Sequence, residues 1–177
     1  MLAFLHPSLG LDEFHSVLNR RSGRWYSACL RITRDEGLAE DAVQEALLKA
    51  WSERGSFRRE ADLDTWIHRI ALNAAIDLMR RRGLAGDQTD DDDLQAAPAS
   101  ISPENAYTQR AIGRDLGAAM RGLTDMERQS FVLKHLEGWQ LSEIAERHGT
   151  SVNNTKQALF RAVKKLRVAM QAWRGEP

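Results

Sequence analysis

Residues Leu141–Arg167 read LSEIAERHGTSVNNTKQALFRAVKKLR, which is two helical patterns separated by a glycine and a short turn. Ser142 can cap the first helix, because its hydroxyl can accept from the free N–H groups of the first turn. Gly149 suits the left-handed conformation that ends a helix, and Ser151 can cap the second helix. The pattern therefore predicts a helix-turn-helix, a motif that places its second helix in the major groove of DNA.

The second helix of this pair has one apolar and one polar side. Small or apolar residues recur every three or four positions and predict a buried stripe of Val152, Thr155, Leu159, Ala162, Val163 and Leu166. On the other side, Asn and Gln can bond bidentately to adenine, and Lys and Arg can reach guanine or phosphate. The alternative is a solvated face on an ordinary helical hairpin. The outward residues are Asn153, Asn154, Lys156, Gln157, Arg161, Lys164, Lys165 and Arg167.

The charge of the chain is strongly segregated. The 177 residues have a formal net charge of zero. Residues 87–104 nevertheless hold six acids and no bases, whereas residues 141–177 hold seven Lys or Arg against three acids. An electrostatic footprint on nucleic acid depends on this distribution rather than on the total.

The composition also limits the class of protein. Cys29 is the one cysteine, which excludes an internal disulfide and a Cys-rich zinc site, and its apolar surroundings predict a buried thiol. No segment approaches the roughly 20 apolar residues that cross a bilayer. The N-terminal run MLAFLHPSLG has no basic residue, so it does not resemble a signal peptide. We expect a soluble cytoplasmic protein.

The fold class predicted by these patterns is all-α, with two small helical domains joined by an acidic flexible linker. Amphipathic patterns predict four helices before residue 83, over residues 11–21, 24–33, 38–54 and 63–82. The last of them places Trp66, Ile67, Ile70, Ala71, Ala74 and Leu78 on its apolar face. Residues 83–102 have little to bury and form the linker. Ser102 and Pro103 start the second domain, in which Thr124 and Glu127 form a capping box and Gly138 ends a helix. The domains are therefore 1–82 and 103–177.

The predicted helix over residues 38–54 has an outward stripe opposite its alanine-rich side. By spacing, the stripe consists of Asp41, Gln44, Glu45 and Leu48. It is either a solvated face or an acidic docking surface for a basic partner.

Residues 57–82 combine an arginine-rich entry loop with the predicted helix over residues 63–82. Rings that stack on bases and cations that hold phosphates are typical of proteins that bind single-stranded or melted DNA. Trp66 taken alone is more typical of a core residue, and Arg80, Arg81 and Arg82 alone could complement a helix dipole. Their combination with a helix-turn-helix favours DNA binding.

An enzyme is disfavoured by the absence of catalytic motifs. The five histidines are scattered, and the sequence contains no H-E-x-x-H, Gly-rich phosphate loop or nucleophile motif. His68 and His135 fit packing or surface positions. We expect no catalytic residue, no metal and no cofactor.

Three strings of this chain, in this order, resemble the sigma-70 family of bacterial RNA polymerase specificity subunits, and most of all its extracytoplasmic-function (ECF) group. They are AEDAVQEALLKAW, then F-x8-W-I-x-R-I-A-L-N-A-A-I-D-x2-R-R, and EIAERHGTSVNNTKQALFRAVKKLR. Together they cover most of residues 10–82 and 103–170. Ala158 stands where many members of the family carry a long polar residue.

The resemblance implies a role for each domain. The first domain (region 2) would bind the clamp helices of core polymerase through Asp41, Gln44, Glu45 and Leu48. A loop over residues 56–64 would capture a flipped base of the −10 element. The second domain (region 4) would read the −35 element, and partners would include the polymerase flap and an anti-sigma factor. The −10 residues would be Arg58, Arg59, Trp66, Arg69, Asn73, Asp77, Arg80 and Arg81. The −35 residues would be Ser151, Asn153, Asn154, Lys156, Gln157, Phe160, Arg161 and Lys164.

Two alternatives stay open on the sequence. A stand-alone helix-turn-helix regulator explains residues 141–167 but leaves the first domain without a role. The linker, with Asp90–Asp93, is either a solvating spacer or a segment that folds back and screens the basic surfaces in the free protein.

Overall fold

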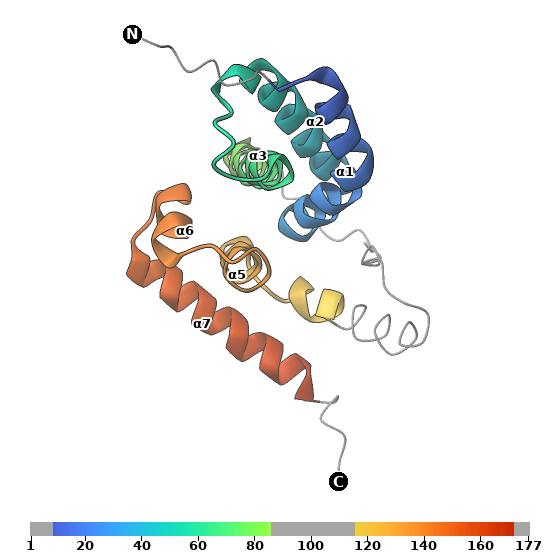
Figure 1. Ribbon diagram of the computed structural model, residues 1–177. Coiled ribbons are helices and arrows are strands. Elements are labelled where there is room, and N and C mark those ends of the chain that lie inside the picture. The colour runs from blue at the N-terminus through green and yellow to red at the C-terminus, as the bar shows by residue number, and fades with distance from the viewer. Residues whose placement is uncertain (1–8, 86–115, 172–177) are drawn as a thin grey trace. The chain divides into compact units, whose positions relative to one another are not determined.

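The computed structural model describes residues 9–85 and 116–171, and every regular element in these two ranges is a helix (Figure 1). The chain divides into two compact units, Met1–Asp92 and Asp93–Pro177. The prediction of an all-α chain with two helical domains is therefore confirmed. The linker beyond Ala85, its aspartate run and the helix start at Ser102 and Pro103 lie outside the described residues. In chain order the elements are α1 (Leu11–Thr33), α2 (Glu36–Ser52), η1 (Arg54–Ser56), α3 (Leu63–Ala85), α5 (Asp125–Phe131), η3 (Val132–Leu136), α6 (Leu141–Arg147) and α7 (Val152–Ala169).

The N-terminal unit is a bundle in which α1, α2 and α3 each contact the other two. Helix α2 contributes a row of four fully buried alanines at three- and four-residue spacing, so its backbone can approach its neighbours closely. Trp51 packs edge-on against Phe14 with ring centroids 5.3 Å apart, and the Arg54 guanidinium lies over Trp51. The expected packing side of this helix is thus confirmed. The four alanines are Ala39, Ala42, Ala46 and Ala50.

The prediction of two helices over residues 11–33 is wrong, because α1 is one continuous helix of 23 residues. Gly23 lies in the gap between the two predicted ranges. A glycine inside a helix costs only about 0.5–1 kcal/mol relative to alanine. Complete burial of Trp25, Ala28 and Ile32 just beyond it outweighs that cost. The helix ends instead at Arg34, which adopts the left-handed conformation (φ 55°) and donates its N–H to the Leu30 carbonyl.

The buried face of α3 is rotated from the expected one. Ile67 and Ala71 are buried as predicted, but Trp66, Ile70, Ala74 and Leu78 are only partly buried. Because α3 contacts both α1 and α2, its buried sector is wide and includes residues that a single stripe omits. These additional buried residues are Leu63, Leu72, Ala75 and Ile76.

A buried carboxylate joins α1 to the start of α3. Asp64, expected in the base-capturing loop, is 5% exposed and lies in the first turn of α3. It accepts a hydrogen bond of 2.7 Å from Nε1 of the fully buried Trp25. Arg24 donates to its other oxygen at 2.8 Å, and Arg21 lies 3.5 Å from the same oxygen. Asp64 is therefore a structural residue, and its assignment to the loop is wrong.

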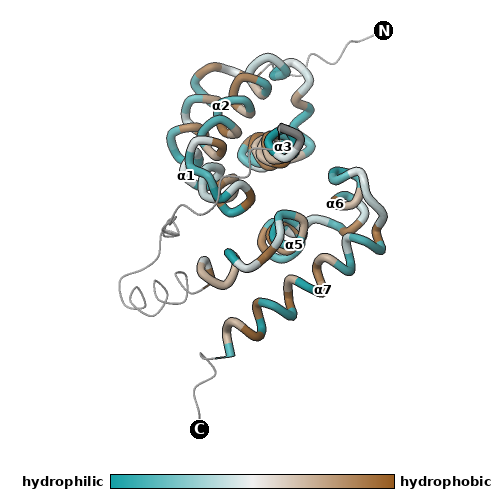
Figure 2. The backbone as a smooth tube through the Cα atoms, turned by 180° about the vertical axis from the view of Figure 1, so that it is seen from behind, coloured by the Kyte–Doolittle hydropathy of each residue, from teal (hydrophilic) through white to brown (hydrophobic). Residues whose placement is uncertain are grey.

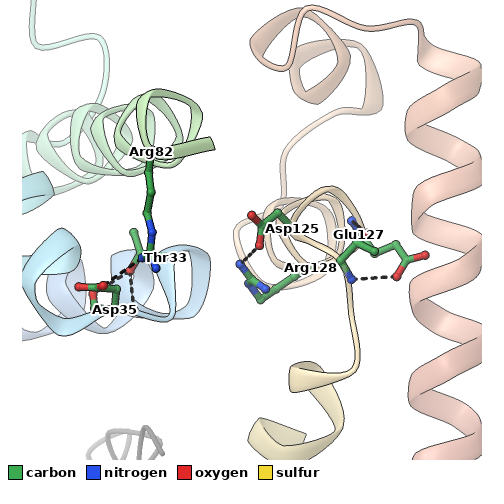
Figure 3. A network of polar contacts seen from close by, with 7 residues as sticks. Thr33, Asp35, Arg82, Asp125, Glu127 and Arg128 are labelled. Atoms are coloured by element: carbon green, nitrogen blue, oxygen red, sulfur yellow. Dashed lines mark hydrogen bonds and ion pairs between the residues drawn. The ribbon is translucent and has the colours of Figure 1, made fainter. Parts of the chain in front are cut away.

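A second polar cluster orders the junction between α1 and α2 (Figure 3). Asp35 caps α2 by accepting from the Leu38 N–H at 2.9 Å, and its other oxygen accepts from Arg82 of α3 at 3.0 Å. The Thr33 hydroxyl bonds to the Asp35 backbone. Asp35 thus links three helices, α2 and α3 through its carboxylate and α1 through its backbone.

In the C-terminal unit, α7 packs against α5 and α6. The predicted capping box of Thr124 and Glu127 is confirmed, and so are the left-handed glycines Gly138 (φ 73°) and Gly149 (φ 62°). The predicted cap at Ser142 is wrong, because α6 begins at Leu141 and its N-cap is Gln140, two residues earlier. The Glu143 carboxylate accepts from the Gln140 N–H there at 2.8 Å.

Candidate functional site

Helix α7 presents a polar surface over its whole length, and Figure 2 shows hydrophilic and hydrophobic positions alternating along it. Its first turn is fixed by Ser151, whose Oγ accepts from the Asn154 N–H at 3.1 Å, as predicted. Phe160 is 72% exposed although it is aromatic. All eight residues predicted to read DNA are exposed: Ser151, Asn153, Asn154, Lys156, Gln157, Phe160, Arg161 and Lys164.

The inward side of α7 agrees with the predicted stripe at Thr155, Ala162 and Leu166. Leu159 and Val163 are only partly buried. Thr155 is fully buried and donates its hydroxyl to the Ser151 carbonyl at 3.2 Å. Val152 is 40% exposed, so its assignment to the buried stripe is wrong. Ala158 is 1% exposed. The position at which many family members carry a long polar residue therefore faces the core in this chain.

Arg161 and Lys165 are both bound to a carboxylate that lies under α7. Glu127 of α5 is 3% exposed, and its oxygens accept from Arg161 Nε at 3.1 Å and from Lys165 Nζ at 2.7 Å. One of the same oxygens accepts from the Thr124 N–H at 3.1 Å. Burial alone would raise the pKa of Glu127, but the hydrogen bonds from Lys165, Thr124 and Arg161 outweigh it and hold the pKa below the ordinary 4.5.

The outward stripe of α2 is exposed as expected, and it meets α3 at one edge. Asp41, Gln44 and Glu45 are exposed, and Leu48 is 74% exposed. A single exposed leucine is ordinary on a protein surface, so Leu48 shows that the stripe is accessible and does not by itself identify a contact surface. Glu45 accepts from Arg81 of α3 at 3.0 Å. The α2 stripe and the arginines of α3 are therefore continuous.

The loop before α3 is held by a side chain of α1. Arg58 and Arg59 are exposed, and both terminal nitrogens of Arg59 donate to Glu13, at 3.1 and 2.8 Å. Arg59 also adopts the left-handed conformation (φ 57°), which an L-residue rarely adopts. Beside it is a hollow of about 330 Å³, lined by Glu13, Phe57, Arg59, Glu60, Ala61, Asp62 and Leu63.

The predicted DNA-binding residues of α3 follow one face of that helix, from its start to its end. Trp66 is half-buried and packs at 5.0 Å against Phe57, so only part of its ring is accessible. Arg80 pairs with Asp77 at 2.9 Å. Arg69, Arg80 and Arg81 are exposed, and Asn73 and Asp77 are partly buried.

Glu13 and Glu127 hold predicted site residues, although the sequence did not indicate these contacts. Glu127 was noted only for its capping box, and nothing local to Glu13 indicates a partner 46 residues away. Among the residues that the structure describes, no group of His, Cys, Asp and Glu could hold a metal ion. In the same ranges, no helix is long and apolar enough to cross a membrane.

Comparisons with known proteins match both units of this chain. Residues 18–85 match the family described as Sigma-70 region 2, and residues 113–166 match Sigma-70, region 4. The chain is 30% identical over 156 residues to the RNA polymerase sigma factor CarQ of Myxococcus xanthus, covering 88% of each. It is 26% identical over 158 residues to the ECF RNA polymerase sigma factor SigE of Mycolicibacterium smegmatis, covering 89% of this chain and 61% of that protein.

Among solved structures, the fold is similar to the sigma factor RpoE in its complex with the anti-sigma factor NepR from Bartonella quintana. The TM-score is 0.60 at 21% identity, and the match covers 91% of this chain and 98% of that one.

Proposed function

The chain belongs to the sigma-70 family of RNA polymerase sigma factors, and from this premise we propose how its surfaces direct polymerase to promoters. It is a sigma factor of the ECF group, which binds core RNA polymerase and confers promoter-specific initiation. The observation that carries this function is the presence of both family regions, in order, in one chain. A stand-alone helix-turn-helix regulator is not favoured, because it leaves residues 18–85 unexplained.

The N-terminal unit makes two contacts, one with core polymerase and one with the −10 strand. The exposed stripe of Asp41, Gln44, Glu45 and Leu48 binds the clamp helices of the polymerase, with Leu48 as its apolar centre. The adjacent face of α3 and the loop before it hold the opened −10 strand. Extracting a base from its stack costs a few kcal/mol, and the hollow at this loop, which is lined by Arg59 together with three acids, is the proposed receiver. The residues proposed for this contact are Arg58, Arg59, Trp66, Arg69, Asn73, Asp77, Arg80 and Arg81.

The C-terminal unit reads the −35 element through α7. Its first turn presents Ser151, Asn153 and Asn154, whose side chains can hydrogen-bond to bases or phosphates. Lys156, Gln157, Arg161 and Lys164 continue the same surface. The same unit contacts the polymerase flap. We also propose residues 1–82 and 103–177 as the limits of the two domains.

We infer the partners and the location from the family. A relative of similar fold was solved with an anti-sigma factor, and we infer that this chain also has such a partner. It acts as an initiation factor in the cytoplasm, where its polymerase works, without a catalytic residue or cofactor of its own.

Run-off transcription with core polymerase on a genomic promoter library tests the function. We expect transcripts from a small subset of promoters that share a −35 and a −10 sequence, and none without this chain. A tight, specific complex with duplex DNA in the absence of polymerase, together with no polymerase-dependent transcription, would contradict the proposal.

A triple variant tests the docking surface. Asp41→Ala, Gln44→Ala and Glu45→Ala together should abolish binding to core polymerase while leaving the helical circular dichroism unchanged, because all three side chains are exposed. Glu36→Gln, which removes another exposed acid of α2, is the matched control and should bind normally. Equal core affinity for the triple variant and the wild type would refute the assignment of this surface.

A further inference from the structure

The Glu127 carboxylate occupies an unusual place for a charged group in a DNA-binding domain. Its side chain is 4% exposed, and it lies beneath the helix proposed to read DNA. A buried charge is tolerated only when its hydrogen-bonding capacity is filled. The Thr124 N–H, Arg161 and Lys165 fill it here, so the carboxylate is both the cap of α5 and an anchor for two cations of α7.

The contact with Glu127 orients the Arg161 side chain and leaves it accessible to solvent. Its Nε is bound to Glu127, yet its side chain remains 55% exposed, so a second ligand can still reach the guanidinium. Because the guanidinium is planar and rigid, fixing Nε fixes the direction of the whole fork. Lys165 is restricted more strongly, since its Nζ also donates to the Gly122 carbonyl at 3.3 Å.

We propose that Glu127 is a positioning residue for promoter recognition, which holds Arg161 of α7 in the orientation that contacts the −35 duplex. This inference rests on the proposed function of α7. Ordering a long side chain is a cost of binding, and a side chain that is already ordered avoids most of it. Glu127 thus raises affinity for the one DNA geometry that suits the fixed fork.

The same carboxylate lowers binding to unrelated DNA. Non-specific binding depends on cations that follow phosphates of any sequence. Glu127 neutralises part of the charge of Arg161 and Lys165 and limits their reach. Its effect is therefore on the ratio of specific to non-specific affinity.

Glu127→Gln is the informative substitution, because the amide keeps the size of the side chain and an oxygen for the Thr124 N–H but loses the charge. The assay is titration of the full chain, bound to core polymerase, with two duplexes at several salt concentrations. One duplex carries the promoter selected from the genomic library, and the other is a scrambled duplex of equal length. We expect promoter affinity to fall about threefold to tenfold, as for one ordered side chain, with equal or tighter binding of the scrambled duplex.

Two further variants separate positioning from stability. Thr124→Ala removes the hydroxyl that accepts from the Glu127 N–H and leaves the carboxylate in place, so it should not change the affinity ratio. In an Arg161→Ala background, Glu127→Gln should cause no further loss of promoter affinity, because Glu127 acts through Arg161.

The inference is overturned if Glu127→Gln leaves the ratio unchanged, if its loss of promoter affinity persists in the Arg161→Ala background, or if Thr124→Ala has the same effect. A wild-type holoenzyme that does not distinguish the two duplexes would instead overturn the proposed function, and this inference with it.

Discussion

Replacing Asp64 by alanine should destabilise the N-terminal unit by about 2–4 kcal/mol, the largest effect we expect from a single polar substitution there. The substitution leaves Nε1 of Trp25 without its acceptor, in a side chain that is 0% exposed. A buried donor without a partner costs about 1–3 kcal/mol. Arg24 and Arg21 are 53% and 54% exposed, so water screens them and each pair adds only about 0–1 kcal/mol.

Asp64→Asn separates the two contributions. The amide oxygen can still accept from Trp25 while the charge is lost, so the cost should fall to about 1–2 kcal/mol. A double-mutant cycle with Trp25→Phe should give a coupling energy of at least about 1 kcal/mol, because the two side chains are in direct contact.

Urea unfolding combined with amide hydrogen exchange provides the assay. Exchange in residues 9–85 should accelerate in the Asp64→Ala variant, and exchange in residues 116–171 should not change, because the chain divides into two units. A loss below about 1 kcal/mol for Asp64→Ala, or no coupling to Trp25, would refute the view of Asp64 as a buried structural carboxylate.

Three further predictions concern glycines and acid stability, each measured by unfolding or exchange of the unit concerned. Gly149→Ala should lower the free energy of unfolding by about 1–2 kcal/mol, because φ at this position is 62°. Gly23→Ala should raise it by about 0.5–1 kcal/mol, because an added Cβ meets nothing within 4 Å. Effects of the same sign for the two variants would contradict this reasoning. The folded pKa of Glu127 lies below the ordinary 4.5, so its stabilisation is complete above pH 4.5 and is lost as the pH falls through the folded value; Glu127→Gln should remove this dependence. Burial, and next repulsion from Arg147, lowers the pKa of His148 below 6.5. The C-terminal unit should therefore lose stability as the pH falls from 6.5 towards the folded pKa, and His148→Asn should reduce this pH dependence. An unchanged dependence in the variant would exclude His148 as its source.

Local chemistry made the helix-turn-helix predictable. The caps at Thr124 and Ser151 and the left-handed glycines Gly138 and Gly149 lie where the residue types indicate, because each needs only neighbours within a few positions. Ser142 was misassigned because Glu143 makes the competing capping contact with Gln140, two residues earlier. The exposed face of α7 followed from its periodicity.

Features set by distant contacts were not predictable in this way. The continuity of α1 through Gly23 depends on burial of Trp25 against other helices, and the wide buried sector of α3 depends on its two neighbours. The roles of Asp64, Glu13 and Glu127 depend on partners 34 to 46 residues away. The exposed members of the site were thus accessible from sequence, whereas the acids that hold them were not.

The two sides of α2 differ in the substitutions that they tolerate, because one side carries the row of buried alanines. Ala39, Ala42, Ala46 and Ala50 are each 0% exposed, so any larger residue would overpack the bundle at a cost of about 1–3 kcal/mol. The opposite side carries the exposed stripe from Asp41 to Leu48, which contacts α3 through the surface pair of Glu45 and Arg81. Substitutions on the outward side can therefore change what the helix binds at little cost to folding, whereas enlarging an alanine of the inner row would disturb the whole bundle.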